Sequence, residues 1–558
     1  MVRKVSAMKS AKQRGNEYDV AILGSGMAGG MLGAVLARNG VRVLLLDAGT
    51  HPRFAVGEST IPYTSGMTRL IADRYQVPEL MPLSSFKGIR TKVSRNCGQK
   101  QNFGFVYHQE GRSQAADQVN QLVVPSAIRT ETHLFRQDID SYLFNVAVKY
   151  GAHPRLATRI ADIEIDPDSG AVLRTEGGEE FRASYVVDGS GFRSPLADKF
   201  GLRETPTRAR THSRAMFTHM VGVKPFDQSP TASRHGQPNP WHNGTLHHVF
   251  DGGWLWVIPF DNHADSLNPL CSVGLTLDPR VFPKGELSAQ QEFDDFLARF
   301  PEIAWQFEGA KAVRPWVSTG RLQYSANQVV GDRFCLTSHA AGFIDALYSR
   351  GLTNTLELVN ALGWRLIAAS RDGDWSLPRF EYLEHLQQGL FDFHDDIVYS
   401  SFVGFRDYEL WNAVNRTWML GTMLGNVMLE DAYYRYQKTG REDVFLDLEQ
   451  SKHPGSPLPV SSGFNEMGVL AREQCLAVEA GTVTPAKAAE RILAHIKNAD
   501  FISPSFALGE RDSRCFNMTP GKMAANALWC RRDAPPEIGG RMINASKGLV
   551  RMRLRGGE

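Results

Sequence analysis

The sequence predicts a mixed α/β fold, with a nucleotide-binding domain on a parallel sheet, an inserted antiparallel sheet and a helical C-terminal region. Two short apolar runs, at 18–23 and 41–46, flank a glycine-rich turn and a helical stretch. After Gly351, the apolar residues keep helical spacing. Strand-like segments separated by turns lie between these parts, at 211–224, 245–260 and 271–277.

Length and composition fit a globular protein of several domains. The chain has 558 residues, of which 42% are apolar and 22% charged, and its formal net charge is +2. This balance gives no reason to expect nucleic acid or a membrane as a partner. No stretch reaches the ~18 uninterrupted apolar residues of a membrane span. Six cysteines are too scattered for a C-x-x-C site or a disulfide framework, so we expect reduced thiols in a cytoplasmic protein.

The N-terminal apolar runs predict a βαβ unit. Residues 18–23 read as a strand, residues 31–39 as a helix, and residues 41–46 as a second strand that closes on Asp47. Nearly continuous apolar runs separated by a short helix are typical of a buried parallel sheet. The first 16 residues are polar and basic, without the apolar centre of a secretory signal, and we expect a disordered tail there.

The turn of this unit fits a dinucleotide-binding motif. Gly24, Gly26 and Gly29 form G-x-G-x-x-G between the first strand and the helix, and Asp47 ends the next strand. Glycines permit a tight turn and close approach of a pyrophosphate, while the helix start supplies free N–H groups. The carboxylate would accept hydrogen bonds from the ribose. The sequence therefore predicts a bound dinucleotide.

Three later segments favour FAD over NAD. Asp188 begins an Asp-Gly-Ser-Gly segment after an apolar run, and the segment at 331–351 contains Gly342 and Asp345. Both resemble the second and third glycine-rich segments of FAD enzymes. Arg136, within a predicted helix at 135–143, resembles the arginine that FAD hydroxylases place near the cofactor. No second G-x-G-x-x-G follows a strand, so we expect no dedicated NAD(P)H domain.

The strand and helix patterns also predict the domain organisation. The turn Asp251-Gly252-Gly253 is typical of a hairpin and supports the antiparallel character of the inserted sheet. The C-terminal third carries no motif that indicates chemistry, and we expect it to cap the substrate side. The expected parts are a tail at 1–16, a discontinuous FAD-binding domain at 17–205 and 325–370, an inserted antiparallel-sheet substrate region at 206–324, and a mainly helical domain at 371–558.

Two further motifs identify a family resemblance. Gly57-Glu58-Ser59-Thr60 follows the second strand, and Trp254-Leu255-Trp256-Val257-Ile258-Pro259 follows the hairpin turn. Together, G-E-S and W-x-W-x-I-P resemble the paired signatures of flavin-dependent halogenases. Segments at 98–105 and 340–345 look most like the branch of this family that acts on phenolic rings of tetracycline-type polyketides. The likeness extends over nearly the whole chain.

The resemblance implies a fold, a set of reactants and roles for named residues. The fold is the glutathione-reductase-like FAD-binding fold. FADH2 comes from a separate NAD(P)H-dependent flavin reductase and reacts with O2 and with chloride or bromide to produce hypohalous acid. Glu58 and Ser59 lie near the cofactor. The residues that separate the flavin from a small aromatic or polyketide substrate are Trp254, Trp256, Ile258 and Pro259.

In such enzymes the hypohalous acid travels through the protein to a lysine beside the substrate. The protein must guide the acid, because the free acid oxidises sulfur side chains. Lys100 lies in the segment that resembles the family's lysine segment, with Lys87 and Lys92 as rivals. Burial can lower the pKa of an ammonium and make it nucleophilic. The halide is expected at the backbone amides of Arg350 and Gly351, at the start of a helix.

The chain departs from the family pattern at three points. Ser338-His339 replaces Gly-Asp, Asp345-Ala346 replaces Asp-Pro, and Tyr348 stands where tryptophan halogenases keep a glutamate. The first two changes put flavin contacts in doubt. The third argues against an indole substrate and suits an acidic phenol. A general base for the substrate hydroxyl stays open among Asp345, Tyr348 and His339.

Other functions fit the sequence less well. An FAD-dependent aromatic hydroxylase that binds NAD(P)H directly would use the same fold, but it has no need of Lys100 or of the segment 254–259. A flavin-binding structural or sensor protein is a third reading. No metal site is expected, since His247-His248 lacks further ligands at useful spacing, and no G-x-S-x-G elbow indicates a hydrolase. Whether the substrate is free or bound to a carrier protein stays open.

Overall fold

The apolar run expected at 18–23 is the central strand β1 (Glu17–Leu23) of a largely parallel sheet. It pairs in parallel with β2 (Val43–Leu46) and β10 (Glu180–Asp188), and β10 pairs in parallel with β18 (Phe334–Leu336). The predicted βαβ unit is confirmed. The order β17-β18-β10-β1-β2-β7 is completed by β17 (Val330–Gly331) and β7 (His153–Arg155). The computed structural model describes residues 16–124, 130–449 and 456–554, so the expected tail falls almost wholly outside the described residues.

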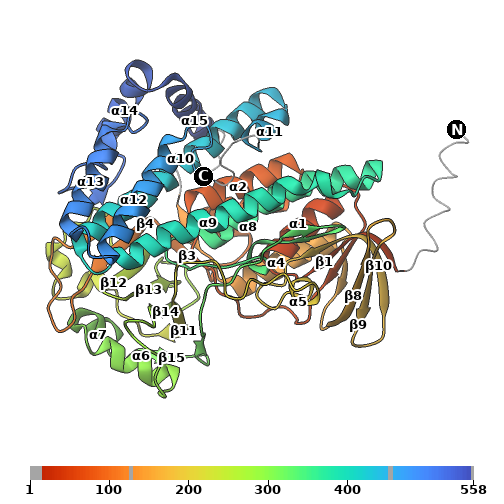
Figure 1. The fold of residues 1–558 in the computed structure, drawn as a ribbon, viewed down its shortest axis with the longest axis horizontal. Helices are drawn as coiled ribbons and strands as arrows, with labels where there is room; N and C mark the ends of the chain where they lie inside the picture. Colours follow the sequence, from red (N-terminus) through yellow and green to blue (C-terminus); the bar gives the residue numbers. More distant parts are fainter. Residues whose placement is uncertain (1–15, 125–129, 450–455, 555–558) are drawn as a thin grey trace, which may run out of the picture.

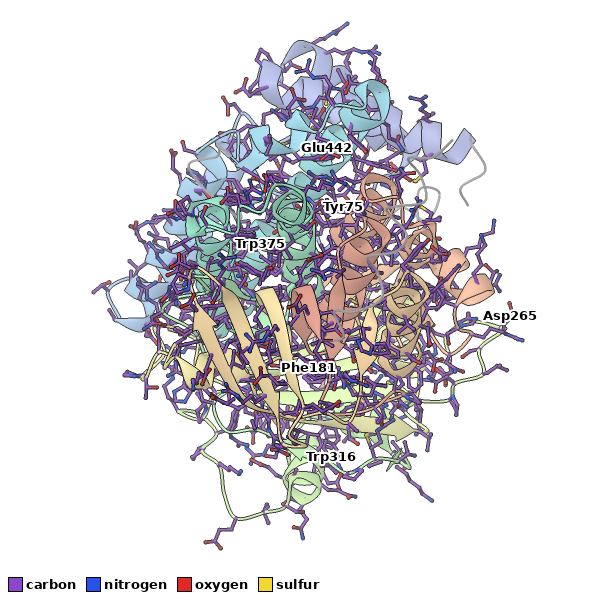
Figure 2. The ribbon with its side chains drawn as sticks, turned by 90° about the vertical axis from the view of Figure 1, so that its right-hand side faces the viewer. Tyr75, Phe181, Asp265, Trp316, Trp375 and Glu442 are labelled. Atoms are coloured by element: carbon purple, nitrogen blue, oxygen red, sulfur yellow. The ribbon has the colours of Figure 1, made fainter. Side chains whose placement is uncertain are left out.

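Helices and a small antiparallel extension surround this sheet. The first helix, α1 (Met27–Arg38), starts four residues before the predicted one, because the helix begins directly after Gly26 in the glycine-rich turn. It packs against α4 (Arg136–Lys149) and α8 (Arg350–Asp372). The strands β8 (Ile160–Asp166) and β9 (Gly170–Thr175) join β10 in antiparallel fashion and form the right-hand end of the molecule in Figure 1. Phe181 marks this sheet in Figure 2.

A second sheet has nine strands. The strands from β11 to β12 pair in antiparallel fashion, as expected, with the hairpin turn at 251–252, whereas β12 pairs in parallel with β4 and β5 in parallel with β19. The structure also corrects the expected limits of that sheet, which draws three strands from outside 206–324, because the register pairs β4 with β12 and β19 with β5. The strands, in sheet order, are β15 (Lys311–Ala312), β11 (Arg214–Val221), β14 (Cys271–Leu277), β13 (Gly253–Pro259), β12 (Thr245–Phe250), β4 (Asn102–Tyr107), β5 (Val119–Val123) and β19 (Cys515–Phe516), with β16 (Val317–Ser318) beside β11.

A separate two-stranded ribbon carries Lys100. It pairs β3 (Gly98–Lys100) with β6 (Glu131–His133) in antiparallel register, so Lys100 faces Glu131 as its cross-strand partner. The preceding helices α2 (Pro62–Arg74) and α3 (Phe86–Lys92) lead into it, with the short turn η1 (Pro78–Ser84) between them.

The C-terminal third is helical, as predicted. The long helices α8 and α9 run above both sheets in Figure 1, and α12, α13 and α14 lie at its upper left, on the side of the nine-stranded sheet. Arg74, at the end of α2, pairs with Glu442 (N–O distance 2.6 Å), at the place where Tyr75 and Glu442 are labelled in Figure 2. The helices are α9 (Glu381–Gly404), α10 (Tyr408–Thr439), α11 (Asp443–Glu449), α12 (Gly463–Glu479), α13 (Pro485–Asn498), α14 (Pro520–Arg532) and α15 (Pro536–Leu554), with the shorter α5 (Pro195–Lys199), α6 (Ala289–Leu297) and α7 (Pro301–Phe307) earlier in the chain.

Two further features agree with the sequence. All six cysteines have free thiols, and only Cys515 is partly exposed. Among residues 16–124, 130–449 and 456–554, none of the helices combines the length and the apolar character that a membrane crossing demands.

Candidate active site

A groove of about 550 Å³ lies at the carboxyl ends of β1, β2 and β10, the edge at which parallel sheets bind nucleotides. The glycine-rich turn lines it, and the structure gives each glycine a reason. Gly24 has φ +92°, and a Cβ there would lie 2.6 Å from the carbonyl oxygen of Gly189. A Cβ on Gly29 would lie 1.8 Å from the carbonyl oxygen of Gly24. The helix start and the turn can therefore lie this close together only because Gly29 has no side chain. Gly26 lines the groove, and a Cβ on it would contact Asp140 at 3.6 Å and Arg53 at 3.8 Å without a clash.

Asp47 lies at the end of β2 on the wall of this cofactor groove. Its carboxylate accepts hydrogen bonds from the backbone N–H groups of Ser25 (2.7 Å) and Gly49 (2.8 Å) and forms an ion pair with Arg53. Although burial opposes ionisation, the bonds from Arg53, Ser25 and Gly49 lower the pKa of Asp47 to about 2. Asp47 is therefore an anionic acceptor at neutral pH, which suits ribose hydroxyls.

These residues fit a dinucleotide such as FAD. The turn offers a cradle that side chains would fill, the helix α1 begins at it without a side-chain cap, and the carboxylate stands at the far wall. The groove continues toward a second cavity, since His339 and Leu352 line both. A ligand longer than a mononucleotide can therefore extend from one into the other.

The structure places the other predicted cofactor residues at different distances from this groove. Arg136 lines it, pairs with Asp140 (2.8 Å), and donates to the carbonyl oxygens of Val56 (2.7 Å) and Gly57 (3.1 Å), which fixes the loop before Glu58. We expected Asp188 at the cofactor, but its side chain does not line the groove, because it turns back to accept hydrogen bonds inside its own turn from Ser190, Ser194 and Leu196.

Gly342 also differs from the expectation. It lies against the Phe391 ring, which a Cβ would approach to 2.9 Å, and it lines a small cavity of about 50 Å³ beside the cofactor groove. Its neighbour Phe343 does line the cavity next to the groove. The glycine therefore allows close packing of α9 on this segment.

The second cavity, of about 320 Å³, brings the two family motifs together, and we call it the motif cavity. Glu58 and Ser59 line one side, and Trp254, Trp256 and Ile258 line another. Successive side chains of a strand alternate in direction, so the W-x-W-x-I spacing on β13 aims all three into the same space. The two indole rings lie with their centroids 5.5 Å apart. Pro259 does not line the cavity; its carbonyl oxygen accepts from His133 instead (2.8 Å).

Buried polar groups in the motif cavity have defined partners. Glu58 accepts a hydrogen bond from Nε2 of His219 at 2.8 Å. Asp345 lines the cavity, where burial raises its pKa to about 6 in spite of hydrogen bonds from Leu347 and Ser213. Burial lowers the pKa of His339, which lines the same cavity, to about 4, so its ring is neutral at pH 7.

Lys100 is completely buried beside the motif cavity. Its Nζ donates to Oγ of Ser59 (2.6 Å) and to the carbonyl oxygen of Thr60 (2.9 Å), and it lies 3.5 Å from the centroid of the Phe103 ring. Burial lowers the lysine pKa well below its usual range, with the charge of Glu131 acting in the opposite direction. The alternative lysines, Lys87 and Lys92, belong to α3 and are exposed.

A chain of hydrogen bonds links the lysine to both motifs. Ser59 Oγ also contacts Oγ1 of Thr245 (2.9 Å), which contacts Nε2 of His133 (2.9 Å). His133 then reaches the carbonyl oxygen of Pro259. Sequence reasoning missed Thr245, His133 and His219. None of them belongs to a motif, and the three lie on different strands that are far apart in the sequence.

A third cavity, of about 690 Å³, has Phe103 in its wall, and we call it the C-terminal cavity. Phe103, Leu122 and Phe516 line it as one row across β4, β5 and β19, where they are register partners. Sequence reasoning assigned the C-terminal helices a cap and no residues. One face each of α10, α14 and α15 completes the walls through Thr422, Met423, Asn426 and Val427, through Met523, Asn526, Ala527 and Cys530, and through Met542, Ile543, Ser546, Lys547 and Val550.

The predicted halide position lies at the start of α8. Ser349 has φ +54° and caps the helix without a side-chain hydrogen bond, and Gly351 lines the motif cavity. The Arg350 side chain points elsewhere, into a separate cavity of about 110 Å³ that Tyr63 and Glu357 also line. Of this segment, Ser349, Gly351 and Leu352 line the motif cavity, and Arg350 does not.

Tyr348 borders neither large cavity. Its ring stacks on Trp418 at 4.6 Å between centroids, and its hydroxyl contacts Ser401 Oγ at 2.6 Å. Asp345 and His339, the other candidates for a base, line the motif cavity and not the C-terminal cavity. None of the three therefore lines the C-terminal cavity.

The nucleotide groove lies at the carboxyl edge of a parallel sheet and is continuous with an aromatic cavity beside a buried lysine. This arrangement is typical of a flavoprotein whose cofactor faces a second cavity. A family model described as an FAD binding domain matches residues 17–266. The chain is 44% identical to the tetracycline 7-halogenase of Kitasatospora aureofaciens, over 96% of this chain and 97% of that one. It is 48% identical to the monodechloroaminopyrrolnitrin halogenase PrnC of Pseudomonas fluorescens, over 94% and 93%.

Solved structures agree with these relatives. The crystal structure of the halogenase PltM in complex with phloroglucinol and FAD has a TM-score of 0.86 and 32% identity, covering 89% of this chain and 99% of that one. The chain belongs to the flavin-dependent halogenases. It is an oxidoreductase that uses FAD, a halide and O2, and the alternative of an aromatic hydroxylase or a sensor protein is set aside.

Proposed function

We propose that the chain halogenates a phenolic ring, as found in tetracycline-type polyketides, and that the ring lies in the C-terminal cavity while hypohalous acid reaches it by way of Lys100. The contacts of Lys100 support this most directly. Its Nζ touches Ser59, which lines the motif cavity, and the ring of Phe103, which lines the C-terminal cavity. The lysine thus stands between the two spaces.

Reduced FAD, when bound, supplies the oxidising equivalent from O2 that turns chloride or bromide into hypohalous acid. The residues of the chain position the halide and the phenol and guide the hypohalous acid. The amides at the start of α8, at Arg350 and Gly351, would hold the halide, because helix N-termini carry positive potential. Trp254, Trp256 and Ile258 would keep the phenol away from the flavin.

Lys100 would hold the acid beside the ring. The lowered pKa of its buried amine favours the neutral form, which can accept a proton or attack the halogen as a nucleophile. Ser59 and Thr60 fix the position of Nζ, and Ser59 is in turn held by Thr245.

The walls of the C-terminal cavity suit an acidic phenol. Among the residues that the structure describes there, no side chain is a carboxylate, whereas Arg531, Lys547 and Arg551 are basic. Positive charge favours the phenolate form, which is the more reactive form toward an electrophile. A volume of about 690 Å³ lies within the ~300–1,000 Å³ usual for ligand pockets and admits several fused rings.

The names of the relatives leave two ring classes for comparison. One relative is named for tetracycline, and the other for monodechloroaminopyrrolnitrin, so both a tetracycline-type phenol and an aminopyrrolnitrin-type ring enter the test. We also propose that a separate NAD(P)H-dependent reductase provides FADH2, since the sequence has no second dinucleotide motif.

The test is a coupled assay with FAD, a flavin reductase, NADH, O2 and chloride, in which product mass shows the chlorine isotope pattern. We expect a chlorinated phenol from the wild type, and none from Lys100→Ala while flavin oxidation continues. Lys87→Ala, which removes an exposed lysine, serves as the matched control and keeps product formation. Equal product from Lys100→Ala would overturn the role of the lysine. Turnover of the aminopyrrolnitrin-type substrate alone would overturn the proposal of a phenolic substrate.

A further inference from the structure

Oxidisable sulfur is distributed unevenly between the two reaction cavities. Four methionines and one cysteine line the C-terminal cavity: Met423, Met518, Met523, Met542 and Cys530. The residues described around the motif cavity include neither methionine nor cysteine. The space in which hypohalous acid would form is therefore walled without sulfur, and the space beyond Lys100 is rich in it.

These sulfur groups extend from the rim of the C-terminal cavity to its interior. The Met523 side chain is 43% exposed, whereas Met542 is 3% and Cys530 8% exposed. Sγ of Cys530 and Sδ of Met542 lie 3.6 Å apart, which joins α14 to α15 through sulfur. Sulfur groups on α10, α14 and α15 therefore surround this cavity.

We infer that Met423, Met518, Met523 and Met542 are internal oxidation sites, which consume hypohalous acid that leaves Lys100 when no aromatic ring fills the cavity. In this step the thioether sulfur attacks the halogen of the acid and loses two electrons. Hydroxide leaves as the sulfur–halogen bond forms, and water then displaces halide from the halosulfonium and becomes the sulfoxide oxygen. It releases two protons, one of which neutralises the hydroxide, so the net products are sulfoxide, halide and one proton. The inference rests on the proposed function, because Lys100 must pass the acid into this cavity.

Oxidation would change the cavity as well as protect the surroundings. A sulfoxide is polar and chiral, and it replaces a flexible apolar group in a wall that contacts the substrate. Turnover without substrate should therefore weaken substrate binding progressively. Methionine sulfoxide reductases reverse the change, so activity lost in this way is recoverable.

The experiment turns over the holoenzyme with flavin reductase, NADH, O2 and chloride, without organic substrate and with catalase present. Peptide mass spectrometry then locates added oxygen atoms. Met81 on η1 is the matched control, because it is half-buried like Met518 but packs against the core of the nucleotide-binding domain. We expect at least about tenfold faster oxidation at Met518 than at Met81, and loss of this difference when chloride is omitted or substrate added.

Equal rates at Met518 and Met81 would overturn the inference, because they would indicate acid released into bulk solution. So would unmodified cavity methionines in an enzyme that still makes chlorinated product, and this outcome leaves the proposed function standing. Failure of both product and sulfoxide formation would count against the proposed function itself. Met518→Leu and Met542→Leu conserve side-chain volume. Relative to its own starting rate, each variant should lose activity more slowly during turnover without substrate.

Discussion

Glu58 and His219 are joined by a hydrogen bond of 2.8 Å in the interior, although they are 161 residues apart in the chain. The glutamate belongs to the loop that follows β2, and the histidine belongs to β11 of the nine-stranded sheet. Their side chains are 2% and 1% exposed, so neither can exchange this bond for water. The pair fixes the cofactor-side loop against the sheet that carries the W-x-W-x-I-P segment.

Replacing His219 by leucine should therefore destabilise the protein and the cofactor site together. A buried carboxylate without its donor costs about 1–3 kcal/mol. We expect a corresponding fall in the free energy of unfolding by denaturant, and weaker FAD binding by fluorescence titration. His219→Gln keeps a donor and should recover most of the loss; if both variants matched the wild type, the bond would have no such role.

Gly29→Ala should abolish cofactor binding. The added Cβ would lie 1.8 Å from the carbonyl oxygen of Gly24, so the turn must move away from the helix start. The variant should purify without the yellow absorbance of FAD. Gly468→Ala is the control, since Gly468 lies within α12 with no atom within 4 Å of the added Cβ. FAD retention by Gly29→Ala would contradict the role of the close approach.

Gly274→Ala should disturb the motif cavity by displacing the ring of Trp256. Gly274 lies opposite Trp256 on β14, and its Cβ would lie 2.1 Å from the indole ring. Overpacking of this kind costs typically about 1–3 kcal/mol. We expect a lower melting temperature and altered flavin fluorescence. Gly285→Ala, in an open position of a loop, should change neither, and an unaffected Gly274→Ala would show that Trp256 is free to move.

The protein should lose stability as the pH falls from about 6.5 toward 4. Burial lowers the pKa of six histidines to about 3 or 4, so these bind protons in the unfolded chain before they do so in the folded one. Each contributes up to about 1.4 kcal/mol per pH unit in this window. Acids whose pKa burial raises act oppositely, among them Asp345, with a pKa of about 6, Asp188 and Glu357. The six are His133, His247, His394, His235, His248 and His339.

Unfolding free energies measured by denaturant at several pH values test this. His394→Gln removes one of the buried rings and should flatten the acid slope, whereas His385→Gln, at an exposed position, should leave it unchanged. A stability that is constant between pH 7 and 5 would be incompatible with neutral buried histidines.

Local patterns predicted the parts of the fold that depend on neighbours in sequence. The runs that became β1 and β2, the turn at Gly24 and the acceptor Asp47 all follow from short-range rules of strand, helix and turn chemistry. The alternation of Trp254, Trp256 and Ile258 likewise predicts one shared face, and the structure confirms that these side chains line one cavity.

Contacts between distant segments explain what sequence reasoning missed. The surroundings of Lys100 come from Ser59, Phe103 and Glu131, and the chain of hydrogen bonds continues through Thr245 and His133. No period or motif relates these positions. Asp188 shows the converse, since a residue in the expected place can still turn its side chain into its own loop.

The pairing of β19 with β5 has a consequence for how such enzymes diversify. Two residues, Cys515 and Phe516, attach the end of the chain to the edge of the sheet farthest from β11, so the walls contributed by α14 and α15 never touch the cofactor groove. Under the proposed function, substitutions there should reshape the space offered to the ring and leave flavin binding unchanged. Exchange of residues 515–554 between relatives should accordingly carry substrate preference with it and leave reoxidation of the flavin at its original rate.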